Sequence, residues 1–210
     1  MILAVVLLAG RTAPALAETD IDREYKVKAA FLLNFIKFVD GGRFNPHDGA
    51  DPGADEPNGP IVVAVLGTPP STEAFAELAG RQVRDRSVVV RQFKGFDELK
   101  SEQGKIPELH PDMEQIKKCH VLFLCPAEKP FVRQTLATLR TEGILTVADV
   151  PGFLQAGGVI NFVIEEKKVR FEVNLAAAAR AKLQVRSSLL RLAIKIVEHD
   201  EWDRQDGERS

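Results

Sequence analysis

The sequence predicts an α/β fold: a single domain with a mostly parallel central sheet, flanking helices and a C-terminal antiparallel hairpin. Apolar runs without alternation, at residues 61–66, 121–124 and 144–147, indicate strands that are buried on both faces. Helical segments are interleaved with these runs, which is the order of a parallel sheet. Two later strands, 158–164 and 168–173, are joined by only three residues. That connection is too short for a parallel crossover, so these strands form a hairpin.

Residues 1–17 are predicted to be a secretory signal peptide. Residues 2–9 form an apolar run of eight, and Ala15-Leu16-Ala17 has the small-x-small pattern that signal peptidase accepts. A membrane span needs about 20 apolar residues, so the run is too short to be an anchor. The usual basic start of a signal peptide is missing, which a start codon assigned too far downstream would explain.

The first helix of the folded domain is expected over residues 24–39, a stretch of sixteen residues without Gly or Pro. Its apolar arc covers roughly 200° around the helix axis and includes Phe31, Phe35 and Phe38. Such a helix is covered on two sides, either within the domain or by a second subunit. These three phenylalanines are therefore candidates for a homodimer interface, and packing inside the domain is the alternative.

The next segment is expected to be a flexible loop. Residues 41–60 contain five Gly and four Pro with almost nothing apolar, so they cannot bury enough surface to offset the entropy of ordering. The charged end of the chain, residues 198–210, is expected to fray. The folded domain is thus assigned to residues 18–197.

The other elements follow from apolar runs and capping residues. Pro130 suits the first turn of a helix and Gly143 suits its exit. Asn174 can cap one later helix, and Ser187 or Ser188 can cap the last one. The expected strands are 61–66, 87–93, 120–124 and 144–148; the expected helices are 72–79, 130–142, 175–182 and a last one through 189–197; residues 95–118 are expected to be irregular.

Composition and charge restrict the classes of function. The 210 residues are 45% hydrophobic and 28% charged, which excludes collagen-like, wholly disordered and multi-span membrane proteins. A formal net charge of −2 provides no basic field for a phosphate backbone, so no nucleic-acid partner is expected. Phe accounts for 12 of the aromatic residues, against one Trp and one Tyr, which indicates buried surface more than stacking platforms.

Motifs for catalysis, cofactors or metals are not recognised, so no catalytic residue and no cofactor are expected. The turn at residues 67–70 lacks the glycine spacing of nucleotide-binding loops, and a Gly-x-Ser-x-Gly elbow is missing. A metal site at His110, Asp112 and Glu114 is conceivable, but a solvated acidic loop is favoured. Asp149 ends a strand where α/β sheets place functional groups, yet a single carboxylate is not a mechanism.

The two cysteines are not expected to form a disulfide with each other. A strand between Cys119 and Cys125 holds them about 20 Å apart, whereas a disulfide needs Cα atoms within about 7 Å. Two small buried side chains are the favoured interpretation, and an intermolecular bond is the alternative.

Two surfaces are candidates for binding. Arg170 and Glu172 project from the half-exposed last strand of the hairpin, beside Phe153 and Leu154, and these four residues are the partner-binding candidates. The alternative is a small-molecule sensor or carrier that uses the crevice at the carboxyl ends of the parallel strands. That crevice is expected near Gly67, Pro126 and Asp149.

Four blocks of the sequence resemble one known family, and they occur in the family's order. They are residues 24–39, residues 119–124, residues 144–163, and residues 169–178 together with 187–193. The similarity is to the YfiR-like (DUF4154) periplasmic proteins and extends from about residue 24 to residue 196. Two features differ from the family: Asp40-Gly41 replaces its usual Trp-Pro pair, and cysteines upstream of Cys119 are missing, so redox tuning by such disulfides is not expected.

The resemblance implies an exported α/β protein that tends to dimerise and is not an enzyme. The family's namesake represses a membrane-bound diguanylate cyclase by binding its periplasmic sensor region, which keeps cyclic di-GMP and biofilm formation low. An outer-membrane lipoprotein releases that repression. The resemblance therefore implies a periplasmic regulatory binding protein whose partners are the sensor region of an inner-membrane signalling protein, an outer-membrane lipoprotein and a second copy of itself.

Overall fold

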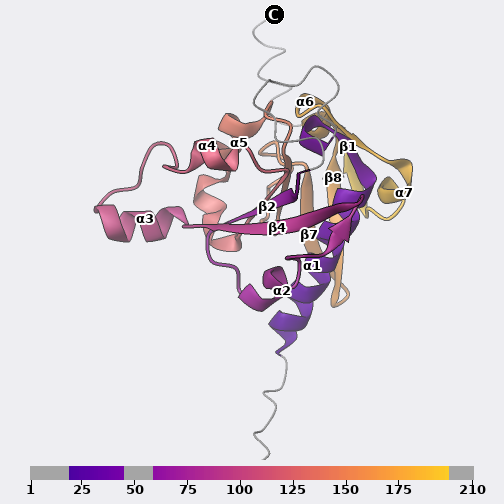
Figure 1. Cartoon of the computed structure of the whole chain (residues 1–210), viewed down its shortest axis with the longest axis horizontal. Helices are drawn as coiled ribbons and strands as arrows, with labels where there is room; N and C mark the ends of the chain where they lie inside the picture. Colours follow the sequence, from indigo (N-terminus) through magenta and orange to yellow (C-terminus); the bar gives the residue numbers. More distant parts are fainter. Residues whose placement is uncertain (1–18, 45–58, 199–210) are drawn as a thin grey trace, which may run out of the picture.

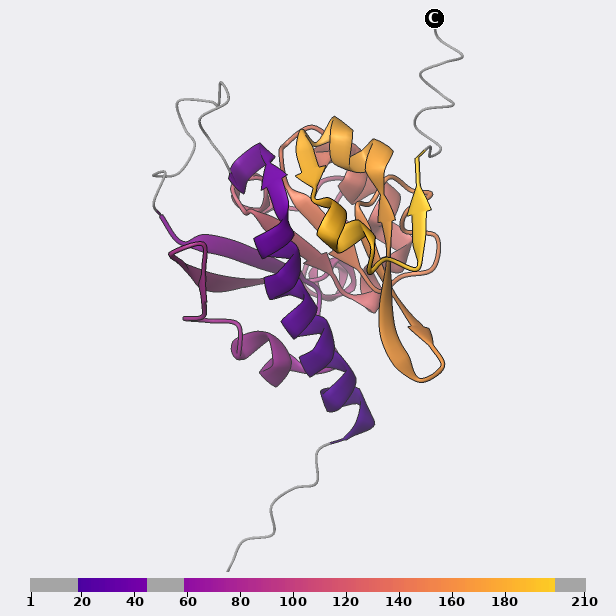
Figure 2. The same cartoon turned by 90° about the vertical axis from the view of Figure 1, so that its right-hand side faces the viewer.

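An eight-stranded sheet forms the centre of the domain, and helices cover both of its faces (Figures 1 and 2). The computed structural model describes residues 19–44 and 59–198. The strand order is β10-β8-β7-β6-β5-β2-β4-β3. The strands are β2 (Ile61–Leu66), β3 (Gln82–Val83), β4 (Arg86–Phe93), β5 (Val121–Leu124), β6 (Leu145–Ala148), β7 (Ile160–Glu165), β8 (Lys168–Asn174) and β10 (Lys195–Val197).

The predicted fold class is confirmed. Neighbouring strands from β4 through β7 are parallel, and β10 is parallel to β8. The predicted hairpin is β7–β8, whose last pair is Glu165 with Lys168. Its two turn residues, Glu166 and Lys167, have φ angles of 49° and 61°, the left-handed values of a tight hairpin turn.

Helix α1 (Asp20–Phe38) lies across one face of the sheet (Figure 2). A capping box fixes its start, because the side chains of Thr19 and Asp22 each accept a hydrogen bond from the other's backbone N–H. The Phe35 ring packs between the rings of Phe162 and Phe171, with centroid distances of 5.5 and 5.0 Å. Side chains of the sheet thus cover the apolar arc of the helix from within the same chain.

The opposite face of the sheet is covered by helices between β4 and β6. In β2, Val63 and Val65 face the α1 layer, whereas Ala64 and Leu66 face the other layer. This two-sided burial explains why the strand sequences do not alternate. The helices on the two faces are α2 (Thr72–Ala76), α3 (Phe96–Gln103), α4 (Met113–Ile116), the 3-10 turn η2 (Pro126–Phe131), α5 (Val132–Leu139), α6 (Leu175–Arg180) and α7 (Ser187–Leu190).

Two expectations about local structure are wrong. The stretch 95–118 is not irregular, because it contains α3 and α4, and α3 ends at Gly104 in the left-handed conformation with φ 75°. The last helix does not reach residue 197: α7 ends at Leu190, and residues 195–197 form β10. The free edge of β8 provides the backbone partners that favour a strand there, beginning with the hydrogen bond from Ile194 N to Phe171 O at 3.0 Å.

The start of the expected flexible loop is also ordered. Residues Val39–Gly41 form β1, which pairs antiparallel with β9 (Leu183–Val185), and the 3-10 turn η1 (Gly42–Phe44) follows. Asp40 holds this small sheet through Arg186, at 2.6 and 3.1 Å, and Arg84, at 2.9 Å. The Arg186 hydrogen bonds lower the pKa of the Asp40 carboxyl.

Other expectations concern segments outside the described residues. They are the signal peptide at 1–17, the middle of the Gly/Pro-rich loop at 45–58, and the tail at 199–210. Within the two described ranges, we find no helix of the length and apolar character that a membrane crossing needs.

Candidate functional site

The carboxyl ends of β2, β5 and β6 meet at one edge of the sheet, which we call the carboxyl edge. The residues that follow these strands are Gly67, Cys125 and Asp149. Open α/β sheets bind ligands at this position. In this chain the carboxyl edge is occupied by side chains from α1 and from η2.

Lys28 of α1 is the central cation of the carboxyl edge. Its side chain is fully buried, and its ammonium group contacts Asp149 Oδ2 and lies 2.5 Å from Glu24 Oε1. The ammonium also lies 4.2 Å from the centroid of the Tyr25 ring. A buried charge requires such compensation, because an unpaired ammonium group loses its hydration.

Tyr25 completes the cluster. Its hydroxyl donates a hydrogen bond to Asp149 Oδ2 at 3.2 Å. Burial, followed by the Asp149 charge, raises the pKa of the Tyr25 phenol, so this group stays protonated and remains a donor. Asp149 therefore joins the end of β6 to the amino-terminal half of α1.

Sequence reasoning missed Lys28, although it found Asp149. The available signal was the spacing of Glu24 and Lys28, four residues apart on one helix, where opposite charges meet. That spacing is common on exposed helix faces. Only the fold shows that Asp149, 121 residues further along the chain, is the second carboxylate.

Glu128 fills the other half of the carboxyl edge. Its side chain is buried, and Oε2 accepts the backbone N–H of Phe96 at 3.1 Å, at the start of α3. A Cβ atom at Gly67 or Gly95 would lie 2.6 or 2.2 Å from Glu128 Oε1, so only glycine leaves room for this carboxyl group. Burial raises the pKa of Glu128, and the nearby Asp97 and Glu98 act in the same direction.

The surroundings of the two cysteine thiols and of His110 indicate structural roles for these groups. Cys119 and Cys125 are both buried thiols, and burial raises the pKa of Cys125, which disfavours the reactive thiolate. His110 Nδ1 accepts the Asp112 N–H at 3.1 Å, and its Nε2 lies 2.9 Å from Lys94 O. Among the residues that the structure describes, no three His, Cys, Asp or Glu side chains are grouped to hold a metal ion.

Two of the four predicted partner-binding residues are in the core. Phe153 is 0% exposed and Leu154 is 1% exposed, so neither is available to a partner in this conformation. The Phe153 ring packs over Gly158, where an added Cβ would lie 2.1 Å from its Cε1 atom. Arg170 and Glu172 are half-buried on β8, so they keep surface that a partner can contact.

The three phenylalanines of α1 differ in exposure. Phe35 is 0% exposed and belongs to the core, so in this conformation it is not available to a homodimer interface, contrary to the expectation from the sequence. Phe31 is partly buried against Phe162 and Phe171, and Phe38 is also partly buried. Of the three phenylalanines, only Phe31 and Phe38 therefore keep surface that a second subunit could contact.

At a second edge of the sheet, apolar side chains are exposed within residues 19–44 and 59–198. Leu192, Ile194 and Ile196 are 62%, 43% and 43% exposed; Ile196 lies in β10, and Leu192 and Ile194 lie in the segment that connects α7 to this strand. Within the described part of the chain, β10 has a strand neighbour on one side only, which is β8. We call these three side chains and the outer side of β10 the C-terminal edge.

Comparisons with known proteins give one extensive match. A family model described as DUF4154, YfiR/HmsC-like, matches residues 25–194. A conserved domain protein from Vibrio cholerae O1 biovar El Tor is similar with TM-score 0.48 and 9% identity, over 65% of this chain and 54% of that one. The ABC domain in complex with L-Trp from Streptococcus pneumoniae is similar with TM-score 0.42 and 10% identity, over 65% and 55%. The chain thus spans about half the length of these structures. The curated proteins contain no match.

Proposed function

The chain belongs to the YfiR/HmsC-like family of periplasmic regulators, and from this we propose that it represses a membrane-bound signalling enzyme by protein contact. The proposed enzyme is of the diguanylate cyclase type, and the proposed contact is with its periplasmic sensor region. Repression then lowers cyclic di-GMP and biofilm formation. The proposal includes export through the signal peptide at residues 1–17, and it includes no catalytic activity.

The contrast between the two edges supports binding to a protein. Tyr25, Lys28 and Glu128 fill the carboxyl edge, where a small-molecule sensor of this fold class would hold its ligand. Exposed apolar side chains instead gather at the C-terminal edge. Protein interfaces have an apolar centre with polar groups around it, and an unpaired strand can add a partner's strand.

The C-terminal edge also has polar groups at its border. Lys195 is in register with Glu172, so these two side chains lie side by side at the outer strands of the sheet. Arg170 is two residues before Glu172 on the same strand. The proposed contact surface is therefore the C-terminal edge with Leu192, Ile194 and Ile196; Ile196 lies on the face of its register partner Val173, and Arg170 and Glu172 lie on the opposite face of the same edge.

Repression requires that the protein bind one state of the sensor region more tightly than the other. A ligand with equal affinity for two conformations does not change their populations, however tightly it binds. The proposed contact therefore favours the inactive arrangement of the enzyme. An outer-membrane lipoprotein that competes for the same surface would release this repression.

The test is a charge placed at the centre of the contact surface. Ile194→Glu in the chromosomal gene should raise cellular cyclic di-GMP to the level of a gene deletion, while the amount of exported protein stays the same. Ile106→Glu is the matched control, because Ile106 is 40% exposed, close to the 43% of Ile194, but lies between α3 and α4. Full repression by the Ile194→Glu protein would contradict the proposed surface, and unchanged cyclic di-GMP in the deletion would contradict the function.

A homodimer through the partly exposed Phe31 and Phe38 is the remaining part of the proposal. Phe38→Asp should convert a dimer to a monomer in light scattering at a fixed protein concentration. If light scattering shows that the wild-type chain is a monomer at every protein concentration measured, the proposed homodimer is wrong.

A further inference from the structure

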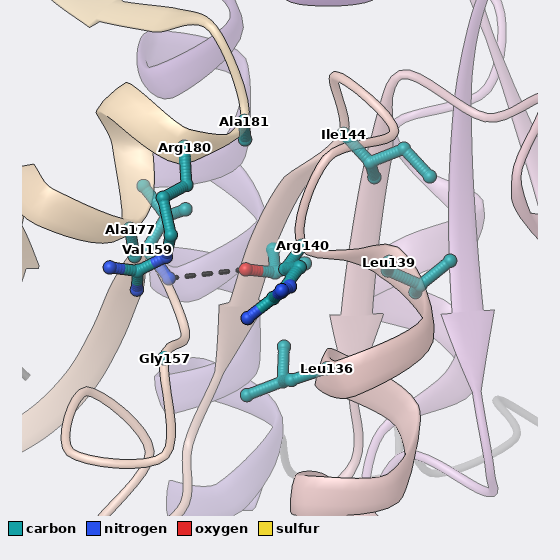
Figure 3. A pocket seen from close by; sticks show the side chains of 10 residues that line it. Leu136, Leu139, Arg140, Ile144, Gly157, Val159, Ala177, Arg180 and Ala181 are labelled. Carbon is teal, nitrogen blue, oxygen red and sulfur yellow. Dashed lines mark hydrogen bonds between the residues drawn. The ribbon is translucent and has the colours of Figure 1, made fainter. Parts of the chain in front are cut away.

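The hollow between the ends of α5 and α6 is too small for a ligand (Figure 3). Leu136, Ile144 and Ala177 are among the residues that line it, and its interior of about 10 Å³ has room for about one water molecule. Arg140 and Arg180 also line the hollow, and both already have interaction partners. A strand with an open side, in contrast, can bind a peptide by adding it to the sheet.

Strand β4 has such an open side. β3 pairs only with the first two residues of β4. The next residue, Val88, donates its N–H to Arg81 O at 2.8 Å and accepts the Gly80 N–H at 2.9 Å. In the part of the chain that the structure describes, residues 89–93 of β4 have β2 as their one strand neighbour. We call residues 89–93 the open stretch of β4.

The backbone groups of Val90 and Gln92 point to the open side. Along a strand these groups alternate between two sides, and those of Val88 point to β3, away from β2. The Phe93 carbonyl agrees with this alternation, because it accepts the Gly67 N–H at 3.1 Å on the β2 side. A peptide beside the open stretch can therefore pair with the N–H and C=O groups of Val90 and Gln92.

The open stretch presents an apolar and a basic side chain on the face of the sheet that is turned away from α1. Val89 and Arg91 lie on this face, because their register partners are Val62 and Ala64, which pack in the layer opposite α1. Val89 is 36% exposed, and Arg91 is also exposed. An added strand therefore meets a valine and an arginine that are both accessible.

The charges around the open stretch are unbalanced. Residues 80–94 include five basic side chains and one acid, Asp85. Two of the five, Arg84 and Lys94, form salt bridges with acids of other segments. Arg91 forms no salt bridge within the described ranges, so its charge favours an acidic partner.

We propose that the open stretch of β4 binds an extended acidic segment of a partner protein. The backbone of the segment pairs with Val90 and Gln92, and an acidic side chain lies opposite Arg91. A second copy of the chain fits less well, because its own β4 would bring like charges together. This contact is separate from the C-terminal edge, because β4 and β10 lie towards opposite borders of the sheet (Figure 2).

The test is the fluorescence anisotropy of a fluorescein-labelled peptide, Glu-Val-Glu-Val-Glu-Val, mixed with the exported chain. The comparison peptide, Lys-Val-Lys-Val-Lys-Val, carries the same label and should bind more weakly at the same ionic strength. Arg91→Glu should weaken binding of the acidic peptide about fivefold and strengthen binding of the basic one. Arg191→Glu is the matched control, because it makes the same change of charge at an exposed residue after α7 and should leave both affinities unchanged.

A proline tests the strand addition itself. The Val90 N–H is not used in the pairing with β2, and the open side of an outer strand tolerates proline, so Val90→Pro should keep the wild-type fold in circular dichroism. It should weaken binding of the acidic peptide about tenfold, because the added strand loses a donor and meets the proline ring. Val90→Ala keeps the N–H and should bind like the wild type.

Three outcomes would overturn the proposal. The first is that the acidic peptide does not bind the wild-type chain. The second is that Arg91→Glu, or a folded Val90→Pro, binds it as tightly as the wild type. The third is that Arg191→Glu weakens binding and Arg91→Glu does not, which would place the peptide at the C-terminal edge.

Discussion

The carboxyl edge and the C-terminal edge belong to the same sheet but differ in chemistry and in access. The carboxyl edge has polar groups, among them Lys28, Asp149 and Glu128, yet these groups are used to hold α1 and α3 against the strands. The C-terminal edge has exposed apolar side chains, and among the described residues its strand β10 pairs on one side only. The topology of an α/β sheet therefore indicates which edge commonly binds a ligand. The burial of the side chains at that edge then decides whether a ligand has room there.

The first helix causes the difference. Its amino-terminal half brings Tyr25 and Lys28 to the end of β6, and its carboxyl-terminal half packs on β7 and β8 through Phe35. Helix α1 does not extend over β10, where α7 and the following residues lie at the border of the sheet (Figure 2). The helix thus closes one edge and leaves the other accessible.

Removal of Asp149 should have the largest effect on stability. Breaking a buried ion pair leaves an uncompensated charge and costs about 3–5 kcal/mol. Asp149 is partly exposed and Glu24 still pairs with Lys28, so Asp149→Ala should lower the free energy of unfolding by about 2–3 kcal/mol. Urea denaturation at pH 7 measures this change.

Glu165→Ala is the control for that variant, because Glu165 is an exposed carboxylate at the hairpin tip. It should change the free energy of unfolding by less than about 0.5 kcal/mol. If Asp149→Ala lowers the free energy of unfolding no more than the control does, the ion pair between Lys28 and Asp149 does not hold α1 at the carboxyl edge. The two edges would then not differ in how firmly they are closed, and a small-molecule site at the carboxyl edge would be favoured over a protein contact at the C-terminal edge.

The fold class was predictable, whereas the closure of the carboxyl edge was not. Continuous apolar runs and a short hairpin connection are local features. The pairing of β2, β5, β6, β7 and β8 confirms the strands and the hairpin, although the connection has two residues and not three, because Glu165 pairs with Lys168. The contact of Lys28 with Asp149 joins residues 121 positions apart, and no local pattern encodes it. The burial of Phe153 likewise depends on the space over Gly158.

The open edge was missed for a different reason. Residues 189–197 contain apolar side chains at helical spacing and also, at 192, 194 and 196, at strand spacing. A short segment of this kind is ambiguous between the two periods. The free side of β8 decides the outcome, and that depends on the whole sheet.

Glu128 provides a pH-dependent test of the carboxyl edge. Because its pKa is raised above the ordinary 4.5, the folded state binds the proton more tightly than the unfolded state. Its contribution to stability is therefore complete below pH 4.5 and is lost as the pH rises through the folded pKa. Glu128→Gln can still accept the Phe96 N–H and cannot ionise, so it should gain stability over the wild type as the pH rises.

Denaturant midpoints from pH 4 to pH 8 measure this difference. Glu165→Gln is the matched control, since it removes one exposed carboxylate of the hairpin tip and should follow the wild type at every pH. If the denaturant midpoints of Glu128→Gln and the wild type differ by the same amount at every pH, the Glu128 carboxyl has the same pKa in the folded and unfolded states. The buried carboxyl would then be no part of what distinguishes the carboxyl edge.

The smallest effect on stability is expected at the C-terminal edge. Leu192 is 62% exposed, so Leu192→Ser removes few contacts and should change the free energy of unfolding by less than about 0.5 kcal/mol. Urea denaturation checks this, with Leu189→Ser as the contrasting variant, because Leu189 is 1% exposed and should lose about 2 kcal/mol or more. A loss of more than about 1 kcal/mol in Leu192→Ser would mean that this side chain supports the domain itself. The C-terminal edge would then be a second packed border, and its apolar side chains would no longer favour a partner.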